Sequence, residues 1–122
     1  MKTRVMLVED NKMSSRLVEY VLERENFSTI VLENAEDAIR AATENPPDIM
    51  LMDIQLPDMD GLEATSLLKK NPVTAGIPIV AITAHAMAGD EDRIRAAGCE
   101  GYISKPINTR ELADTIREYL HS

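Results

Sequence analysis

The sequence is poor in the residues that several classes of protein require. It holds one cysteine, Cys99, so no disulfide can form within the chain, which fits a reducing cytoplasm. We expect Cys99 to be a small packing residue rather than a reactive thiol. No apolar run approaches the roughly 20 residues that a bilayer span needs. The apolar run at 5–8 is also too short for the core of a signal peptide. These absences predict a cytoplasmic protein without membrane insertion.

Basic and aromatic residues are also scarce. There are 13 lysines and arginines against 21 aspartates and glutamates, which gives a formal net charge of −8. Proteins that bind nucleic acid depend on many lysine and arginine contacts to phosphates, and no basic run is present here. One phenylalanine, three tyrosines and no tryptophan offer little surface for stacking bases. Direct nucleic-acid binding is therefore not expected, and no Cys/His grouping suggests zinc.

The chain itself suits one compact domain. Its 122 residues match a typical domain size, and no linker, repeat or low-complexity segment divides them. We therefore expect a single domain over residues 1–122 without a separate output domain.

Short apolar runs alternate with helix-like segments along the whole chain. The runs predict strands at 4–8, 28–32, 46–53, 77–83 and 101–105. Asn11 and Asn34 are expected to cap the first two helices, whose apolar positions are Met13, Leu17, Tyr20 and Val21, and Ala35, Ala38, Ile39 and Ala42. Three more helices are predicted at 61–70, 89–98 and 108–120. Gly98 is expected to end the fourth, and Asn108 with Glu111 to form a capping box for the fifth.

The strand composition then predicts the architecture. The first, third and fourth strands are apolar throughout instead of alternating, which indicates burial on both faces. Five strand–helix units of this kind predict an α/β fold, a doubly wound parallel sheet with helices on each side.

Polar residues collect where the predicted strands end. In open parallel sheets, ligands bind beyond the carboxyl ends of the strands. The residues at those ends are Glu9 and Asp10 after the first strand, Asp53 on the third, Thr83 on the fourth and Lys105 on the fifth. Three carboxylates at close range must take up protons or bind a cation, and oxygen ligands suit Mg²⁺. With the ammonium of Lys105 and the hydroxyl of Thr83, this set is suited to phosphoryl transfer onto a carboxylate.

Four motifs carry a resemblance to a known family. The segments "VEDN", "LMDIQLPDMDG", "AITA" and "YISKPI" occur in order over nearly the whole chain. Together they resemble the receiver domain of two-component response regulators. The resemblance implies a flavodoxin-like fold with strand order 2-1-3-4-5. It also implies that Asp53 accepts a phosphoryl group from a phosphohistidine of a sensor histidine kinase or a phosphotransfer protein.

The resemblance also implies a site. Mg²⁺, for which Mn²⁺ could substitute, would be held by Asp10, Asp53 and the backbone carbonyl of Gln55, with Glu9 assisting through water. Lys105 and Thr83 would contact the phosphoryl group, and the Lys105–Pro106 peptide bond would be cis.

Further residues are expected to act in switching. In the family, an aromatic residue at the position of Tyr102 turns inward when the residue at Thr83 shifts toward the phosphoryl group. Gln55 and His85 would tune the lifetime of the phosphorylated state. Asp58 and Asp60, in contrast, are interpreted as structural residues of the turn before the third helix.

The output is expected to pass by protein contact from a monomer, through the face formed by the fourth helix, fifth strand and fifth helix. The run at 77–107 looks closest to single-domain receivers of the DivK type, which act in cell division and cell fate. Two receiver alternatives stay open, a domain excised from a hybrid histidine kinase and a phosphate-independent interaction module. A third alternative is a metal-dependent phosphatase of the haloacid-dehalogenase kind, which would need an aspartate at position 55, where Gln55 stands.

Overall fold

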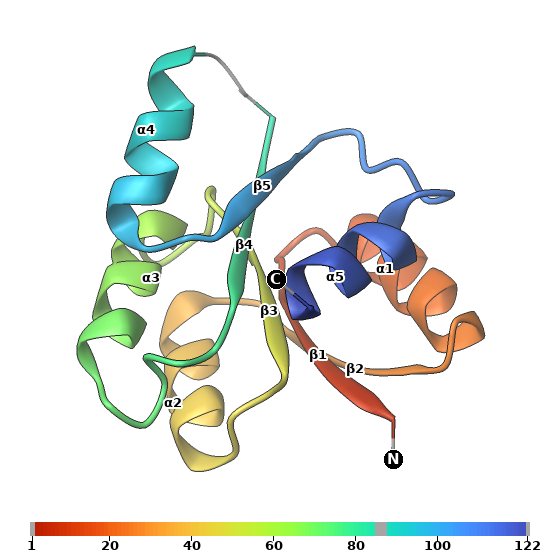
Figure 1. Cartoon of the computed structure of the whole chain (residues 1–122), viewed down its shortest axis with the longest axis horizontal. Coiled ribbons are helices and arrows are strands. Elements are labelled where there is room, and N and C mark those ends of the chain that lie inside the picture. Colours follow the sequence, from red (N-terminus) through yellow and green to blue (C-terminus); the bar gives the residue numbers. More distant parts are fainter. Residues whose placement is uncertain (1, 85–87, 122) are drawn as a thin grey trace.

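The protein is a five-stranded parallel sheet between two layers of helices (Figure 1). The computed structural model describes residues 2–84 and 88–121, with the backbone alone at 88 and 89. The sheet order is β2-β1-β3-β4-β5, which confirms the predicted α/β class and strand order. The strands are β1 (Thr3–Val8), β2 (Phe27–Leu32), β3 (Ile49–Asp53), β4 (Ile79–Thr83) and β5 (Gly101–Ser104).

Five helices cover the sheet. They are α1 (Lys12–Arg24), α2 (Ala35–Glu44), α3 (Gly61–Lys70), α4 (Ala88–Ala97) and α5 (Leu112–Leu120). Helices α1 and α5 cover one face, while α2, α3 and α4 cover the other (Figure 1). Within the described residues, every helix is too short or too polar to cross a membrane.

The side chains of the central strands pack into two separate hydrophobic cores, one on each face of the sheet. This explains why the central strands are apolar throughout. Side chains alternate between the faces of a strand. One face buries Met6, Met50, Met52, Ile79 and Ala81 beneath α2, α3 and α4. The opposite face buries Val5, Leu7, Leu51, Val80 and Ile82 beneath α1 and α5. Since both faces are covered, no position of the central strands favours a polar residue until the strands reach their carboxyl ends.

Most predicted helix ends are confirmed. The side chain of Asn11 accepts a hydrogen bond from the backbone N–H of Ser14 (3.0 Å), and Asn34 caps α2 in the same way. Gly98 follows α4 with a φ of +110°, the left-handed conformation that favours glycine. The adjacent Cys99 is buried, and this burial raises the pKa of its thiol to about 11, as expected for a packing residue.

The predicted apolar face of α1 is wrong at three of its four positions, and of the four only Val21 packs against the core. Met13, Leu17 and Tyr20 are 84 %, 50 % and 60 % exposed, and the helix instead buries Ser15, Val18 and Leu22. Both sets have helical spacing, but at about 100° per residue they lie on nearly opposite sides of the helix. The periodicity of the segment cannot choose between them, because the choice depends on where the sheet lies.

The predicted start of α5 and the capping box are also wrong. Helix α5 begins at Leu112, and Glu111 makes no capping hydrogen bond with its side chain. Asn108 instead closes a turn, in which its side chain accepts from the N–H of Arg110 (3.0 Å). The strands β3 and β4 also begin later than predicted, after Pro47 and Pro78, since proline has no N–H to donate to a strand ladder.

The loop between β3 and α3 is tied to the rest of the fold by two aspartates. The carboxylate of Asp58 accepts hydrogen bonds from the N–H groups of Ala35 (2.9 Å) and Glu36 (2.8 Å) at the start of α2. Asp60 caps α3 by accepting from the N–H of Leu62 (2.7 Å). The structural interpretation of both residues is confirmed, and the link from Asp58 to α2 is an addition to it.

Gly61 lets this loop return to the end of β3. Its N–H donates to the carbonyl of Ile54 (2.8 Å). A Cβ at this position would overlap the carbonyl oxygen of Asp53 and lie 2.9 Å from its carbonyl carbon. The first turn of α3 can therefore approach the strand end only because residue 61 has no side chain.

We predict that Gly61→Ala lowers the free energy of unfolding by about 3 kcal/mol, because the added methyl group meets backbone that cannot move away cheaply. Urea unfolding followed by circular dichroism measures the change. Gly76→Ala is the matched control, since a Cβ there would meet nothing within 4 Å. It should stay within about 0.5 kcal/mol of the wild type. Equal effects of the two substitutions would contradict the close-approach argument.

We also predict a pH-dependent contribution from Asp58. Hydrogen bonds from the N–H groups of Ala35 and Glu36 lower the pKa of Asp58 below its ordinary value of 3.8. The stabilisation is therefore fully present above the ordinary pKa and is lost as the pH falls through the folded-state value. The difference in urea midpoint between wild type and Asp58→Asn should be constant near neutral pH and shrink at acidic pH. A difference independent of pH would contradict the assignment.

Candidate functional site

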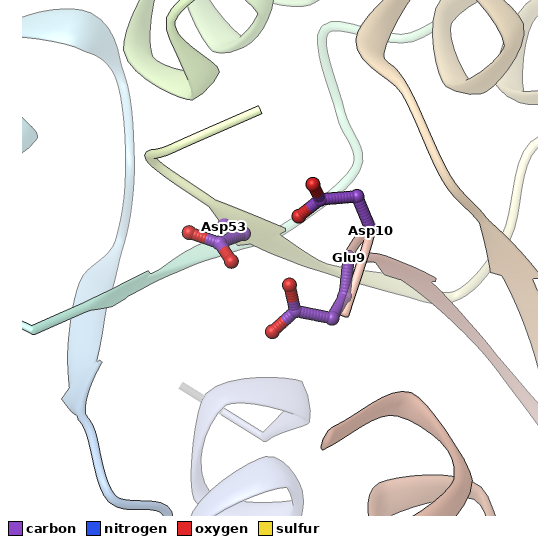
Figure 2. Close-up of side chains that lie close together, drawn as sticks. All are labelled: Glu9, Asp10 and Asp53. Carbon is purple, nitrogen blue, oxygen red and sulfur yellow. The ribbon is translucent and has the colours of Figure 1, made fainter. Parts of the chain in front are cut away.

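Three carboxylates meet at the carboxyl end of the sheet. Glu9 and Asp10 follow β1, and Asp53 ends β3, which lies beside β1 with Val8 paired to Met52. Each of the three residues offers a carboxylate oxygen, and these oxygens all lie within 4.8 Å of one another. Figure 2 shows the side chains turned toward a common space. Chain segments 43 residues apart thus form one acidic cluster because their strands are neighbours.

Asp53 is held from two sides. Its side chain is almost fully buried, with 3 % of the residue exposed. One carboxylate oxygen, Oδ1, accepts a hydrogen bond from the N–H of Gln55 (2.9 Å). The other, Oδ2, accepts from the ammonium of Lys105 (2.7 Å). The carboxylate therefore has a defined orientation and a charged partner.

Lys105 reaches the cluster from the far edge of the sheet. It follows β5, and its backbone N–H donates to the carbonyl of Thr83 at the end of β4 (2.8 Å). Its Nζ lies 3.2 Å from Oε1 of Glu9 in addition to its bond with Asp53. Burial alone would lower the pKa of Lys105, but the two carboxylates outweigh it and the pKa is raised. The side chain is thus a fixed positive charge, and the peptide bond to Pro106 is cis, as expected.

Glu9 is the most deeply buried member of the cluster. It is 2 % exposed, and its Oε2 accepts a hydrogen bond from the N–H of Asn11 (3.2 Å). Its buried Oε1 faces Lys105 but receives no hydrogen bond from the described residues. Burial, followed by the proximity of Asp53, raises the pKa of Glu9 to about 7. Three carboxylates around the one ammonium of Lys105, with Glu9 buried among them, fit a hard divalent cation such as Mg²⁺.

A cavity of about 320 Å³ opens beside Asp53. Thr83, the last residue of β4, is buried at its wall with 6 % exposure. The residues that line the cavity are Asp53, Ile54, Gln55, Thr83, Ala84, Asp90 and Arg93. Two of these, Asp90 in the first turn of α4 and Arg93 one turn later, were not predicted, because the sequence prediction considers strand ends and not helices.

The remaining predicted residues have different outcomes. Gln55 lies at the cavity and its N–H orients Asp53, but its carbonyl as a metal ligand stays a prediction. Tyr102 is half-buried on the edge strand β5 and packs against the core beneath α2, α3 and α4, and its movement in switching stays a prediction. His85 lies outside the described residues.

Comparisons with known proteins agree with this geometry. The family model described as the response regulator receiver domain matches residues 5–117. The chain is 47 % identical to the polar-differentiation response regulator DivK of Brucella anthropi, over 98 % of each chain. It is 46 % identical to DivK of Brucella ovis over the same shares.

Solved structures of similar proteins share the fold. The receiver domain of a sensor histidine kinase from Pseudomonas aeruginosa superposes with a TM-score of 0.91 at 30 % identity, with all of both chains covered. That structure has a magnesium ion coordinated in its active-site cleft. The chemotaxis response regulator CheY4 of Vibrio cholerae has a TM-score of 0.92 at 20 % identity, covering 98 % of this chain and 99 % of that one, which shows the fold alone.

The predicted resemblance is therefore confirmed by a match that covers most of the chain and by relatives that match it nearly end to end. The chain belongs to the family of response regulator receiver domains.

Proposed function

We propose that the protein is a phosphorylation-activated switch in which Asp53 accepts a phosphoryl group from a phosphohistidine. The donor would be a sensor histidine kinase or a histidine phosphotransfer protein. The observation that carries the proposal is the buried Asp53 carboxylate, bonded to Lys105 at 2.7 Å and adjacent to Glu9 and Asp10. A surface acid does not require this arrangement, whereas an acceptor of a charged group does.

The chain's own groups account for the transfer step. An oxygen of Asp53 attacks phosphorus, the P–N bond to the donor imidazole breaks, and an acyl phosphate forms on Asp53. The N–H of Gln55 orients the carboxylate for attack, and the ammonium of Lys105 offsets the negative charge of the incoming group. The hydroxyl of Thr83, at the wall of the same cavity, would then contact the phosphoryl oxygens.

Mg²⁺ is the proposed cofactor, and Mn²⁺ could substitute because it favours similar oxygen ligands. Asp10 and Asp53 would hold the ion with the carbonyl of Gln55, and Glu9 would assist. When bound, the ion supplies the charge neutralisation that three carboxylates and one ammonium lack. The magnesium ion in the related receiver from Pseudomonas aeruginosa supports this assignment.

The donor is proposed to dock on α1. The exposed side chains of Met13, Leu17 and Tyr20 form an apolar stripe on this helix. The stripe adjoins a groove of about 160 Å³ lined by Ser14, Leu17, Val18, Lys105, Pro106 and Ile107. Because Lys105 contacts Asp53 from this side, a partner seated on the stripe would bring its phosphohistidine toward the acceptor.

The surface formed by α4, β5 and α5 is proposed to bind the downstream protein target. Tyr102 borders a cavity of about 280 Å³ formed with residues of β5 and α5, which leaves room for its side chain to change position. The Brucella relatives are polar-differentiation response regulators, which supports a role in cell polarity and, through it, in cell division or cell fate. The protein would act in the cytoplasm as a monomer, without turning over external substrates.

We predict that acetyl phosphate with Mg²⁺ adds one phosphoryl group to the wild type, and that Asp53→Asn abolishes the adduct. Intact-protein mass spectrometry measures it. Asp58→Asn is the control in the same loop, since Asp58 faces the start of α2, and it should be phosphorylated like the wild type. Absence of an adduct on the wild type would favour an interaction module, and rapid turnover of other phosphoesters would favour a phosphatase.

We also predict that Leu17→Ser slows transfer from a phosphorylated phosphotransfer protein about tenfold, the effect of losing most of one buried apolar contact. The rate with acetyl phosphate should not change, because the small donor needs no docking surface. Leu67→Ser on α3 is the matched control, since Leu67 is 45 % exposed and Leu17 is 50 % exposed. Equal transfer rates for Leu17→Ser and Leu67→Ser would refute docking on α1.

A further inference from the structure

A second basic side chain, from α4, lines the cavity beside the proposed acceptor. Arg93 borders the same space of about 320 Å³ as Asp53 and Thr83. Lys105 approaches the Asp53 carboxylate from β5, whereas Arg93 approaches the cavity from the helix layer that contains α3 and α4 (Figure 1). The two cations therefore reach this region from different elements of the fold.

Arg93 is paired with two carboxylates. One nitrogen, Nη1, lies 3.1 Å from Oδ1 of Asp90, one turn earlier on α4. The other, Nη2, lies 3.9 Å from Oδ2 of Asp60, the residue that caps α3. Among the ion pairs of the described residues, this contact alone joins α4 to the N-terminus of α3. The Arg93 side chain is 60 % exposed in both pairs, while Asp60 is 46 % and Asp90 27 % exposed, and solvent-exposed pairs of this kind are weak and easily exchanged.

The charge at the site gives Arg93 a reason to exchange partners. Lys105 already contacts two carboxylates, Asp53 and Glu9. Phosphorylation would convert Asp53 from one negative charge to roughly two, and would add oxygens that accept hydrogen bonds. A guanidinium presents parallel N–H donors that match phosphate oxygens, which makes it a stronger partner for a phosphoryl group than for a solvated carboxylate.

We propose that Arg93 is a second cation for the phosphoryl group, held by Asp60 and Asp90 before phosphorylation and transferred to the phosphoryl oxygens afterwards. The inference rests on the proposed function, with Asp53 as the acceptor. It assigns a consequence to the exchange: the ion pair that joins α4 to the cap of α3 breaks when the phosphoryl group arrives. Phosphorylation would thereby alter how α4 is held, without requiring a change in the sheet.

Other arginines of the chain show the simpler alternative. Arg40 pairs with Glu36 and Asp37, and Arg95 pairs with Glu91, each within its own helix. Pairs of this kind stabilise an exposed helix and need no further role. Arg93 differs from Arg95 in two respects, since it lines the cavity of Asp53 and contacts a second helix. Arg95, two residues further along the same helix, is therefore a suitable control.

The test uses beryllium fluoride with Mg²⁺ as a non-hydrolysable substitute for the phosphoryl group. Its affinity for the full chain can be followed by fluorine NMR. Arg93→Gln should weaken binding about tenfold, the loss of one charge-assisted contact that replaces weaker ones. Arg95→Gln should stay within about twofold of the wild type, since its pair lies outside the cavity. Urea unfolding of both variants checks that the fold is retained.

The variant Asp60→Asn tests whether the ion pair with Asp60 holds Arg93 before phosphorylation. Asparagine can still accept from the N–H of Leu62, so the cap of α3 is kept while the charge facing Arg93 is removed. This variant should bind beryllium fluoride as tightly as the wild type or more tightly. In the wild type, beryllium fluoride should raise the hydrogen exchange of residues 90–97, and in Asp60→Asn that exchange should already be raised without it.

The outcomes distinguish the role of Arg93 from the role of Asp53. Equal affinities for wild type and Arg93→Gln, with an intact fold, would overturn the role of Arg93 and leave the acceptor role of Asp53 standing. Failure of the wild type to bind beryllium fluoride and to form an acetyl phosphate adduct would instead overturn the proposed function, and this inference with it.

Discussion

The contact between Lys105 and Asp53 is the interaction on which the site depends. The ammonium crosses the end of β4 to reach a carboxylate on β3, and it also faces Glu9 at the end of β1. Without it, three carboxylates would be held together at the edge of an apolar sheet with no positive charge among them. Because it still leaves an excess of negative charge, the cluster is suited to a divalent cation. One lysine thus permits the cluster to form and leaves it ready for metal.

Much of the fold could be predicted because the sheet imposes simple rules on the chain. Strands buried on both faces must be apolar throughout, so the acid at the end of β3 and those after β1 stand out at once. Parallel strands bring their carboxyl ends to one edge, so side chains far apart in sequence can be placed together. The helix caps at Asn11 and Asn34 follow from local chemistry alone.

The errors arose where the answer depends on contacts between elements. The apolar positions of α1 fit two faces equally well, and only the place of the sheet shows that Val18 is buried and Leu17 exposed. Asn108 has the composition of a cap, but the chain after β5 uses it in a turn. The position of Arg93 at the site could not be predicted. It depends on a cavity shared with Asp53 and on a contact with Asp60, and no pattern in the sequence around residue 93 indicates either of them.

The loop between β3 and α3 has a consequence for the specificity of signalling. Asp58 and Gly61 fix this loop against the rest of the fold, and the N–H of Gln55 and the ammonium of Lys105 orient Asp53, the proposed acceptor, in the chain by itself. A reactive centre completed by one chain has little means of rejecting a wrong donor. If Asp53 is the acceptor, discrimination between donor kinases would depend on surfaces remote from the chemistry. Those surfaces are free to diverge among related proteins while the acceptor and its neighbours stay unchanged.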